Sequence, residues 1–320
     1  MIFAIGEVLI DFIAVEDADL KYVRVFEKHA GGAPANMVVG LRRLNIPAGL
    51  ISKVGEDALG EFLLEELKKE DVDIRYVKTD YEYPTGVVFV QLRRGKPSFL
   101  LYDKVAYFNL KIEDVDFEII KKAELIHFGG VLLSREPSRT TTLKIAEWAR
   151  GQKIPVSFDV NIRLHLWKSM EDLVKTMRYA FELSSIVKLG EDELELLIKN
   201  GADPRDSNAE IIAITKGNEG STIIHRDRKV DVPPYRVEVV DTTGAGDAYM
   251  AALIASLYSM NKLKNIRLEE DEIKLVGSFS NLVAAISTTK RGAWSTPRIY
   301  ELKDHPEISP IVERLISLRV

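Results

Sequence analysis

The sequence predicts an α/β protein with a mostly parallel central sheet, helices on both faces of that sheet, and a small β lid beside it. Short apolar runs alternate with amphipathic stretches over most of the 320 residues, which is the pattern of repeated strand–helix units. Several of the short runs are apolar at consecutive positions, as expected for strands that are covered on both sides. We therefore expect one domain over residues 1–320, with the lid as part of it.

The alternating part of the chain gives the expected elements in order. The expected strands are Ile2–Val8, Gly49–Val54, Leu125–Phe128, Val156–Val160, Ile186–Leu189, Ile211–Thr215 and Thr222–His225. The expected helices are Ala35–Leu44, Ala58–Lys69, Glu113–Lys122, Pro137–Arg150, Met170–Leu183, Asp192–Lys199, Ala245–Met260 and Glu270–Ser287. After Pro297 the chain is predicted to form a loop and a final helix.

Two regions lie outside this alternation and predict the lid. Residues Asp11–His29 have no helical stripe and are predicted to be extended. Thr85–Leu92 and Pro97–Tyr102 flank a turn at 94–96 and are predicted to form a hairpin. Such segments can pair into a separate sheet, so we expect a lid from about residues 11–30 and 84–109 that excludes water when it closes. An edge hairpin of the main sheet is the alternative.

The composition excludes several kinds of protein. Lys and Arg number 44 against 49 Asp and Glu, and the net charge of −5 gives no broad positive field for a nucleic acid. The absence of cysteine excludes disulfides and cysteine-based metal sites, and it is compatible with a reducing cytoplasm. No apolar run reaches the ~18–20 residues that span a bilayer, and the first residues do not resemble a signal peptide. We expect a cytoplasmic protein without nucleic-acid or membrane partners.

The strongest motif is Asp-Thr-Thr-Gly-Ala-Gly-Asp at residues 241–247, which opens a helix that is apolar almost all round. The small residues Gly244, Ala245 and Gly246 let backbone N–H groups approach an anion, and the helix N-terminus adds partial positive charge. Asp247 lies in the first turn, where the helix dipole favours its ionised form, so it can accept a proton from a hydroxyl group. The pattern predicts a phosphoryl-transfer site, and a simple helix cap is the alternative.

Other glycine motifs do not fit the sequence. The third glycine of a dinucleotide fingerprint is missing, and neither G-x-x-x-x-G-K-[ST] nor G-x-S-x-G occurs. These absences exclude the P-loop and nucleophile-elbow enzymes.

The chain resembles the ribokinase/PfkB-type sugar kinases, and within them the fructokinase-like members. The segment 241–247 is similar to their C-terminal signature. Gly31-Gly32-Ala33-Pro34-Ala35-Asn36 is similar to their N-terminal signature, with Gly40, Gly55 and Gly60 after it. The resemblance runs from about Phe3 to Pro297. It implies a three-layer αβα sandwich of ribokinase-like fold with a β lid, and in-line transfer of the γ-phosphoryl group of MgATP to an alcohol.

The resemblance also implies roles on the nucleotide side of the site. Asp247 matches the catalytic base, and Gly244, Ala245 and Gly246 match the anion hole. The residues matched to ATP are Lys188, Thr215, Gly217, Gly220, Gly244, Gly246 and Asn281.

The metal sites are implied in the same way. Glu191 matches the Glu of an N-x-x-E element that places Mg²⁺ through water, although Lys188 replaces the Asn. Asp241 and the Thr243 carbonyl stand where many members bind a monovalent cation such as K⁺, which is optional in the family.

On the sugar side, the resemblance implies a pocket lined by Asp11, Gly31, Gly32 and Asn36. Carboxylate and amide groups suit paired hydrogen bonds to neighbouring hydroxyl groups. Asp159-Val160-Asn161-Ile162-Arg163 resembles the D-x-N-x-R block of fructokinases and keto-deoxy-gluconate kinases, and Arg163 can bridge the sugar and the transferring phosphate. From the lid we expect contacts by Phe89, Gln91 and Tyr102.

The expected acceptor is a small neutral sugar, with fructose first. Gly-Gly-Ala-Pro-Ala-Asn is the form associated with fructokinases, and no second cation is evident in the predicted pocket to bind a carboxylate. A 2-keto-3-deoxygluconate kinase or a nucleoside kinase of the same family is the alternative, and a non-catalytic sugar-binding protein is the third. Because the lid hairpin is apolar at successive positions, we also expect a homodimer through the lid.

Overall fold

The computed structural model describes the backbone of residues 1–93 and 96–318, and the side chains of those residues except 92, 93 and 96–99. The tip of the predicted hairpin at Arg94 and Gly95 lies outside the described residues.

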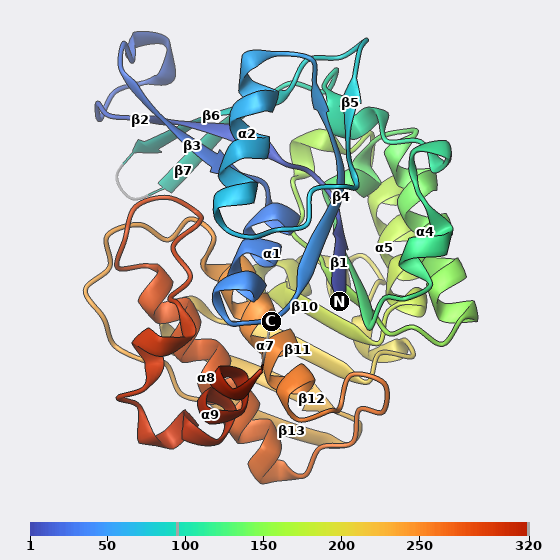
Figure 1. The fold of residues 1–320 in the computed structure, drawn as a ribbon, viewed down its shortest axis with the longest axis vertical. Helices are drawn as coiled ribbons and strands as arrows, with labels where there is room; N and C mark the ends of the chain where they lie inside the picture. The colour runs from blue at the N-terminus through green and yellow to red at the C-terminus, as the bar shows by residue number, and fades with distance from the viewer. Residues whose placement is uncertain (94–95, 319–320) are drawn as a thin grey trace.

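A large sheet forms the centre of the protein (Figure 1). In the described part of the chain it has nine strands in the order β13-β12-β11-β10-β9-β8-β1-β4-β5. Their bounds are β1 Ile2–Ile5, β4 Ala48–Gly55, β5 Val77–Asp80, β8 Leu125–Gly129, β9 Val156–Asp159, β10 Ile186–Gly190, β11 Ile211–Thr215, β12 Ser221–His225 and β13 Arg228–Val232. The strands from β11 to β5 are parallel, and only β12 runs antiparallel to its neighbours.

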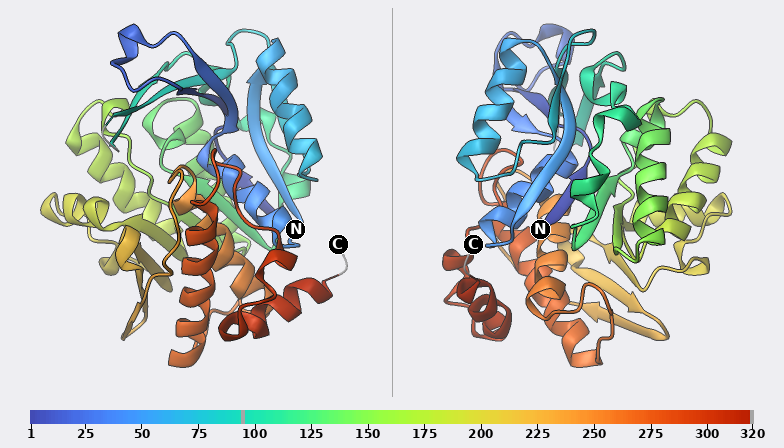
Figure 2. Two further views of the ribbon diagram at one scale, coloured as in Figure 1. Left: turned by 90° about the vertical axis from the view of Figure 1, so that its left-hand side faces the viewer. Right: turned by 45° about the vertical axis from the view of Figure 1, so that its right-hand side comes forward.

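Helices cover both faces of this sheet, as the sequence predicts. One face carries α1 Ala33–Arg43, α2 Ala58–Lys69, α7 Ala245–Ser259, α8 Glu270–Ser287 and α9 Ser309–Ser317. The other carries α3 Phe117–Ile120, α4 Ser138–Gly151, α5 Met170–Leu183 and α6 Glu191–Lys199. The two groups of helices lie on opposite sides of the strands in Figures 1 and 2. No described helix is long and apolar enough to cross a membrane.

A second, smaller sheet is separate from the first. It has the order β3-β2-β6-β7, with β2 Leu9–Ala14, β3 Phe26–Gly31, β6 Gly86–Arg93 and β7 Lys96–Leu101. Figure 2 shows it at one end of the molecule, beyond the main sheet. The hairpin β6–β7 pairs with β2, and not with the main sheet, which excludes the edge-hairpin alternative.

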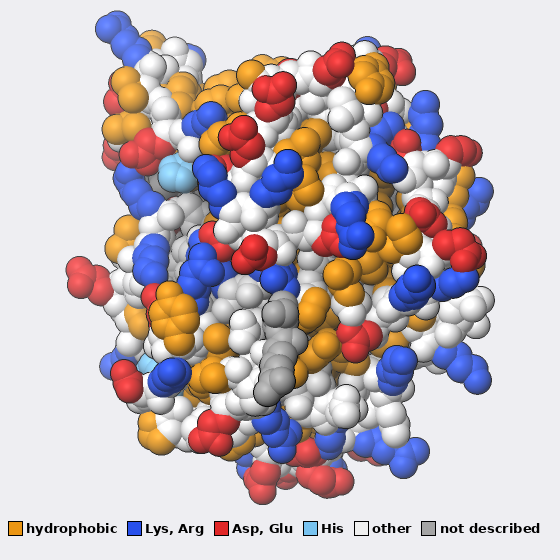
Figure 3. All heavy atoms as spheres, viewed as in Figure 1, with side chains coloured by type: hydrophobic (Ala, Val, Ile, Leu, Met, Phe, Trp, Pro, Cys, Tyr) orange, Lys and Arg blue, Asp and Glu red, His pale blue; other side chains and the backbone are white. Residues whose placement is uncertain are grey.

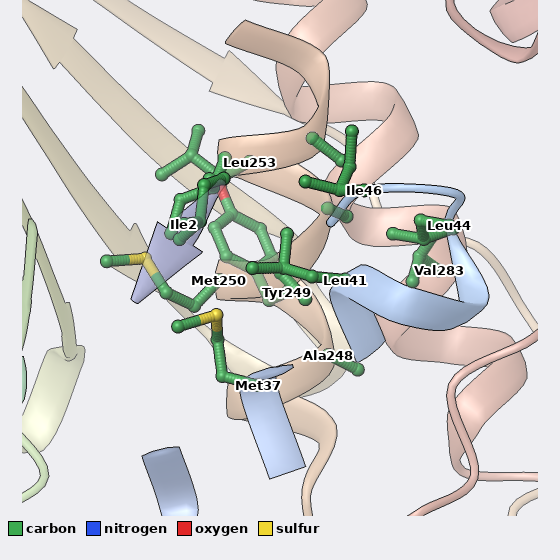
Figure 4. Packing of buried hydrophobic residues seen from close by; sticks show 14 of the residues in the cluster. Ile2, Met37, Leu41, Leu44, Ile46, Ala248, Tyr249, Met250, Leu253 and Val283 are labelled. Carbon is green, nitrogen blue, oxygen red and sulfur yellow. The ribbon is translucent and has the colours of Figure 1, made fainter. Parts of the chain in front are cut away.

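Helix α7 lies at the centre of the core and explains why its sequence is apolar all round. Leu253 and Met250 pack beside Ile2 of β1, Tyr249 packs near Leu41 of α1, and α8 covers another side of α7 (Figure 4). All ten residues from Ala248 to Leu257 are buried. A helix surrounded in this way holds its N-terminus rigidly, which fixes the loop at 241–247.

The differences from the predicted elements lie at edges and short segments. The first strand ends at Ile5, so Asp11 lies on β2 of the smaller sheet and not just past a long β1. The predicted helix Glu113–Lys122 is only Phe117–Ile120, because the side chain of Asp116 accepts from Glu118 N–H and starts a new turn there. The sequence reading missed β5 and β13, which are short edge strands with exposed polar positions.

Charges of both signs are mixed over the surface. Figure 3 shows Lys and Arg interspersed with Asp and Glu over the face seen in Figure 1. This distribution agrees with the small net charge of −5 and leaves phosphate recognition to local groups.

Candidate active site

The carboxyl ends of the parallel strands meet at one edge of the main sheet, and the predicted site residues follow them. Asp159 ends β9, Gly190 ends β10, and Thr215 ends β11. The smaller sheet continues from β1 through β2 at the same edge, because only residues 6–8 separate the two strands. Ligands of open α/β sheets bind at this edge, so the fold brings distant segments to one place.

Asp247 lies in the first turn of α7, after Gly244 has turned the chain with φ of +78°. The first N–H groups of a helix have no acceptor within it, so the turn at 244–246 presents donors beside the Asp247 carboxylate. The predicted roles of this turn as an anion site and of Asp247 as a base are compatible with this geometry and stay predictions.

Asn36, on the first turn of α1, binds Asp247 directly. Its Nδ2 donates to Asp247 Oδ2 at 2.7 Å. On the other side, Trp294 Nε1 donates to Asn36 Oδ1 at 2.9 Å. The sequence predicts that Asn36 contacts the sugar, which stays a prediction, and the structure adds that its amide joins α1 to Asp247.

Lys188 faces the same turn. Its Nζ donates to both carboxylate oxygens of Asp159, at 3.0 and 3.1 Å, and the pair is buried. A Cβ on Gly246 would lie 2.6 Å from Lys188 Nζ, so the missing side chain makes room for the ammonium group at the anion site. Burial alone would lower the pKa of Lys188, but the negative charges around it, Asp159 first, outweigh burial and raise the pKa. Lys188 is therefore a buried positive charge beside the first turn of α7.

The electrostatics of Asp247 differ from the sequence-based expectation. Burial raises its pKa to about 7, and the negative charge of Asp159 adds to this effect. Lys188, the Asn36 hydrogen bond and Arg163 act in the opposite direction. The carboxyl group is thus poised near neutral pH, and not fully ionised as the helix dipole alone suggests.

Gly31 packs against Asp11, and Gly32 follows it at the start of α1. A Cβ on Gly31 would lie 2.1 Å from Asp11 Oδ2, so the backbone of the glycine turn rests on that carboxylate. Gly32 has φ of +103°, which favours glycine. Burial raises the pKa of Asp11 to about 7, Asp247 adds to the shift, and Arg163 opposes it.

Arg163 is half-buried and influences every acid in this cluster. Its positive charge lowers the pKa values of Glu7, Asp11 and Asp247 relative to what burial alone would give. The loop that carries Arg163 is held by Glu193 of α6, whose Oε1 accepts from Ile162 N–H at 2.6 Å. The structure therefore places the Arg163 charge close enough to act on Glu7, Asp11 and Asp247, while its predicted role as a bridge between sugar and phosphate stays a prediction.

Glu7 belongs to the same cluster, although the sequence analysis did not select it. It is 3% exposed, its Oε1 accepts from Ala33 N–H at 3.2 Å, and its Oε2 has no hydrogen-bond partner among the described residues. Burial raises the pKa of Glu7 to about 8, and the charge of Asp247 adds to the shift. Glu7 is accordingly a neutral carboxylic acid at neutral pH.

We expect this burial to make stability depend on pH. In the unfolded chain Glu7 ionises near 4.5, whereas in the folded protein it keeps its proton up to about 8. The stability it contributes is complete below the unfolded pKa and is lost as pH rises through the folded pKa, by at most about 1.4 kcal/mol per pH unit. In thermal unfolding, Glu7→Gln should therefore gain Tm relative to the parent between pH 5 and 8, with no further gain above. The exposed Glu195→Gln is the control, and a difference that is constant with pH would contradict the assignment.

The nucleotide-side residues are placed around the next strands. Thr215 ends β11, and Gly217, with φ of +56°, starts the turn to β12. A Cβ on Gly217 would meet no atom within 4 Å, so its backbone borders open space. Gly220 closes the turn against the carbonyl of Val232. Asn281 is buried on α8, and its Nδ2 donates to the carbonyls of Val232 and Pro233 at 3.1 and 2.9 Å, which leaves only its oxygen free for the predicted adenine contact.

The residues present suit the predicted ions to different degrees. Glu191 is exposed at the start of α6, three residues after Lys188, where it can hold Mg²⁺ through water. No group of three or more His, Asp or Glu among the described residues forms a metal cluster, so phosphate oxygens and water would supply most ligands for Mg²⁺. Asp241 accepts from the N–H groups of Thr243 and Gly292, each at 2.9 Å. Burial would raise the pKa of Asp241, but these hydrogen bonds outweigh it, so the carboxylate stays ionised and can serve a monovalent cation.

The smaller sheet places the predicted lid contacts Phe89, Gln91 and Tyr102 away from Asp11. Phe89 pairs with Phe12 in register, whereas Val88 pairs with Asp11, so Phe89 lies on the opposite face from Asp11. Gln91 follows on the Phe89 face, and its Oε1 accepts from Leu20 N–H at 3.2 Å. Tyr102 lines a hollow of about 430 Å³ with Val87 and Asp57, also away from Asp11. The face that does carry Asp11 presents Val88, Val90 and His29.

Sequence reasoning missed Glu7, Asp159, Glu193 and Trp294 as members of the site. Asp159 was visible only as part of a block chosen for Arg163, and Glu7 only as the polar residue that interrupts an apolar first strand. Trp294 carries no local signal, because its partner Asn36 is 258 residues away.

Comparison with known proteins agrees with this geometry. The model of the pfkB family carbohydrate kinases matches residues 1–298. The chain belongs to this family. It is thus a carbohydrate kinase, a phosphotransferase, and its fold is ribokinase-like.

Individual relatives cover nearly the whole pfkB-family chain. An uncharacterised sugar kinase of Pyrococcus horikoshii is 49% identical over 313 residues, 98% of this chain and 97% of that one. Its structure in complex with ATP has a TM-score of 0.90 and covers 97% of this chain and 100% of that chain. Fructokinase-1 of Zea mays is 34% identical over 98% of each chain. A Vibrio cholerae fructokinase variant with bound fructose, ADP and potassium is 27% identical, has a TM-score of 0.83, and covers 95% of this chain and 97% of that chain.

Proposed function

We propose that this kinase transfers the γ-phosphoryl group of MgATP to a hydroxyl group of a small neutral sugar, with fructose as the first candidate. The observation that carries the reaction is the buried Asp247, held by Asn36 and facing Lys188 at the start of α7. The fructokinases among its relatives support the choice of fructose.

The chain's own residues can perform each step. The acceptor hydroxyl attacks the γ-phosphorus and gives its proton to Asp247, while the bond from the γ-phosphorus to the bridging oxygen breaks and ADP leaves. The first turn of α7 and Lys188 meet the charge on the transferring group. Arg163, Asp11 and the Gly31–Gly32 turn position the acceptor, and we propose that the smaller sheet closes over it as a lid.

We propose ATP as the donor, with Mg²⁺ bound to its phosphates and K⁺ as an optional ion. Relatives with bound ATP, and one with ADP and potassium, support this choice. Mg²⁺ would neutralise the negative charge of the phosphates, with Glu191 nearby. The cysteine-free sequence suits a reducing cytoplasm, which is the location we propose.

One observation favours a second candidate, an acidic sugar. Burial lowers the pKa of His165, and the positive charges of Arg163 and Arg135 lower it further, so both guanidinium groups lie near this ring. A second cation beside Arg163 is what the sequence analysis found missing for a sugar carboxylate.

The test of function is ADP release from MgATP with fructose, ribose, glucose, 2-keto-3-deoxygluconate, adenosine and fructose 6-phosphate. The proposal is supported if kcat/KM is highest with fructose. The second candidate is favoured if kcat/KM is highest with 2-keto-3-deoxygluconate. Sugar binding in calorimetry without any ADP release would contradict catalysis and leave a sugar-binding protein.

We also propose that a second copy covers the outer face of the smaller sheet. Phe12 and Phe89 stack there with ring centroids 5.3 Å apart, and Phe26 contacts Phe89 edge-on. Leu100 pairs with Phe89 on the same face and is 43% exposed. Burial of such a face stabilises association by about 25 cal/mol per Å² of apolar area.

We expect Leu100→Glu to dissociate this dimer, because a charge would be buried at the contact. Sedimentation velocity at micromolar concentration measures the change. Ile198→Glu on α6, at a site 40% exposed, is the control and should leave the oligomer intact. A monomeric parent protein would remove the proposal.

A further inference from the structure

A chain of two hydrogen bonds joins Trp294 to the base. Trp294 Nε1 donates to Asn36 Oδ1 at 2.9 Å, and Asn36 Nδ2 donates to Asp247 Oδ2 at 2.7 Å. An indole N–H can only donate, so the oxygen of the Asn36 amide must face Trp294. The amide nitrogen then faces Asp247. The Trp294 hydrogen bond thus sets the orientation of the Asn36 amide, with its nitrogen toward Asp247.

Without the indole N–H, the amide could rotate by half a turn. Its oxygen would then face the Asp247 carboxylate, and two acceptors cannot share a hydrogen bond unless the acid carries a proton. The ionised form of Asp247 would lose a donor. A donor to the charged form of a carboxyl group stabilises that form, so its loss favours the protonated acid.

The backbone of Trp294 is fixed to the same helix that carries Asn36. Arg43 Nη1, two turns further along α1, donates to the carbonyls of Trp294 and Thr296 at 2.6 and 3.1 Å. Glu70 holds the Arg43 guanidinium from the other side. Because α1 binds both the side chain and the backbone of this segment, the indole cannot drift away from Asn36.

We propose that Trp294 is a positioning residue for the base: through Asn36 it keeps a hydrogen-bond donor aimed at Asp247 and so maintains the carboxylate in its proton-accepting form. The inference rests on the proposed role of Asp247 and adds a residue outside the recognised motifs.

Several charged groups share the surroundings of Asp247 and must stay unchanged in the test. Asp159 lies on β9, Arg163 in the loop after it, and Lys188 on β10. Glu7 lies just after β1, and Asp11 lies on β2. The described hydrogen bond of the Trp294 side chain is the one to Asn36 Oδ1, and its substitution removes that contact.

The test is the pH profile of kcat/KM in Trp294→Phe, with fructose as acceptor or, if another sugar in the panel is preferred, that sugar. The ascending limb of this profile reflects the ionisation of Asp247, whose pKa is about 7. We expect the limb to move to higher pH by on the order of 0.5–1 unit. We also expect kcat/KM at pH 7 to fall about tenfold, with the KM for ATP unchanged. Trp148→Phe, at an indole that packs on Phe117, is the control and should leave the limb in place.

Two further variants show whether Trp294 acts through its N–H group or through the packing of its ring. Replacing Trp294 by β-(3-benzothienyl)alanine removes the N–H and keeps the ring size, so it should move the limb as Trp294→Phe does. In an Asn36→Ala background, Trp294→Phe should have no further effect on the limb. A limb that stays in place in both Trp294 variants, or effects that add in the double variant, would overturn the proposal. Full turnover in Asp247→Asn would overturn the assigned base instead, so the two failures are distinguishable.

Discussion

Asp247→Asn should lower kcat by about 10²–10⁴-fold, the range that a positioned general base contributes. The amide oxygen can still accept from Asn36 Nδ2, so the local geometry is retained and only the proton acceptor is lost. The KM for ATP should change little, because the backbone donors at 244–246 remain. Steady-state kinetics with the preferred acceptor measures both constants.

Asp271→Asn is the matched control for this change. Asp271 also lies in the first turn of a helix, α8, and its side chain is 99% exposed. It should leave kcat unchanged. Turnover of Asp247→Asn within tenfold of the parent would refute the assignment of the base.

Lys188→Met is expected to have the second largest effect, a fall in kcat of roughly 10²–10³-fold, comparable to the loss of one oxyanion donor. Lys188 Nζ lies where a Gly246 side chain would be, at the first turn of α7. Its charge also lowers the pKa of Asp247, so the ascending limb of the kcat/KM profile should move to higher pH.

Loss of Lys188 also leaves Asp159 as a buried charge without its partner, which typically costs about 3–5 kcal/mol of stability. The double variant Asp159→Asn with Lys188→Met removes that penalty. We expect it to regain most of the lost Tm and little of the lost kcat. Recovery of kcat together with Tm would show that Lys188 acts only on the fold.

The smaller sheet shows where sequence reasoning stopped. Its strands were predictable, because extended apolar stretches outside the αβ alternation have few other structures open to them. Which residues share a face with Asp11 was not predictable. Strand residues alternate between faces, so a choice between Phe89 and Val88 depends on the pairing register with β2, and that register is a long-range property.

The pKa values of the buried acids were also not predictable from the sequence. Helix-dipole reasoning on Asp247 gave an ionised carboxylate, and the structure gives a pKa of about 7 because the group is buried beside Asp159. Desolvation depends on what the rest of the chain packs around a residue, and a local motif does not contain that information. Glu7 escaped notice for the same reason.

The sequence by itself determined the fold class and the family, and it selected the candidate base Asp247 and the candidate anion-binding turn at 244–246. Each of these depends on local features: hydrophobic periodicity, small residues at a helix start, and a short motif of fixed spacing. The tertiary structure decided which side chains of the small sheet share a face with Asp11, and that Asn36 binds both Asp247 and Trp294. These contacts join residues more than 200 positions apart, and only the packing of α1, α7 and the segment at 294–296 brings them within hydrogen-bonding distance.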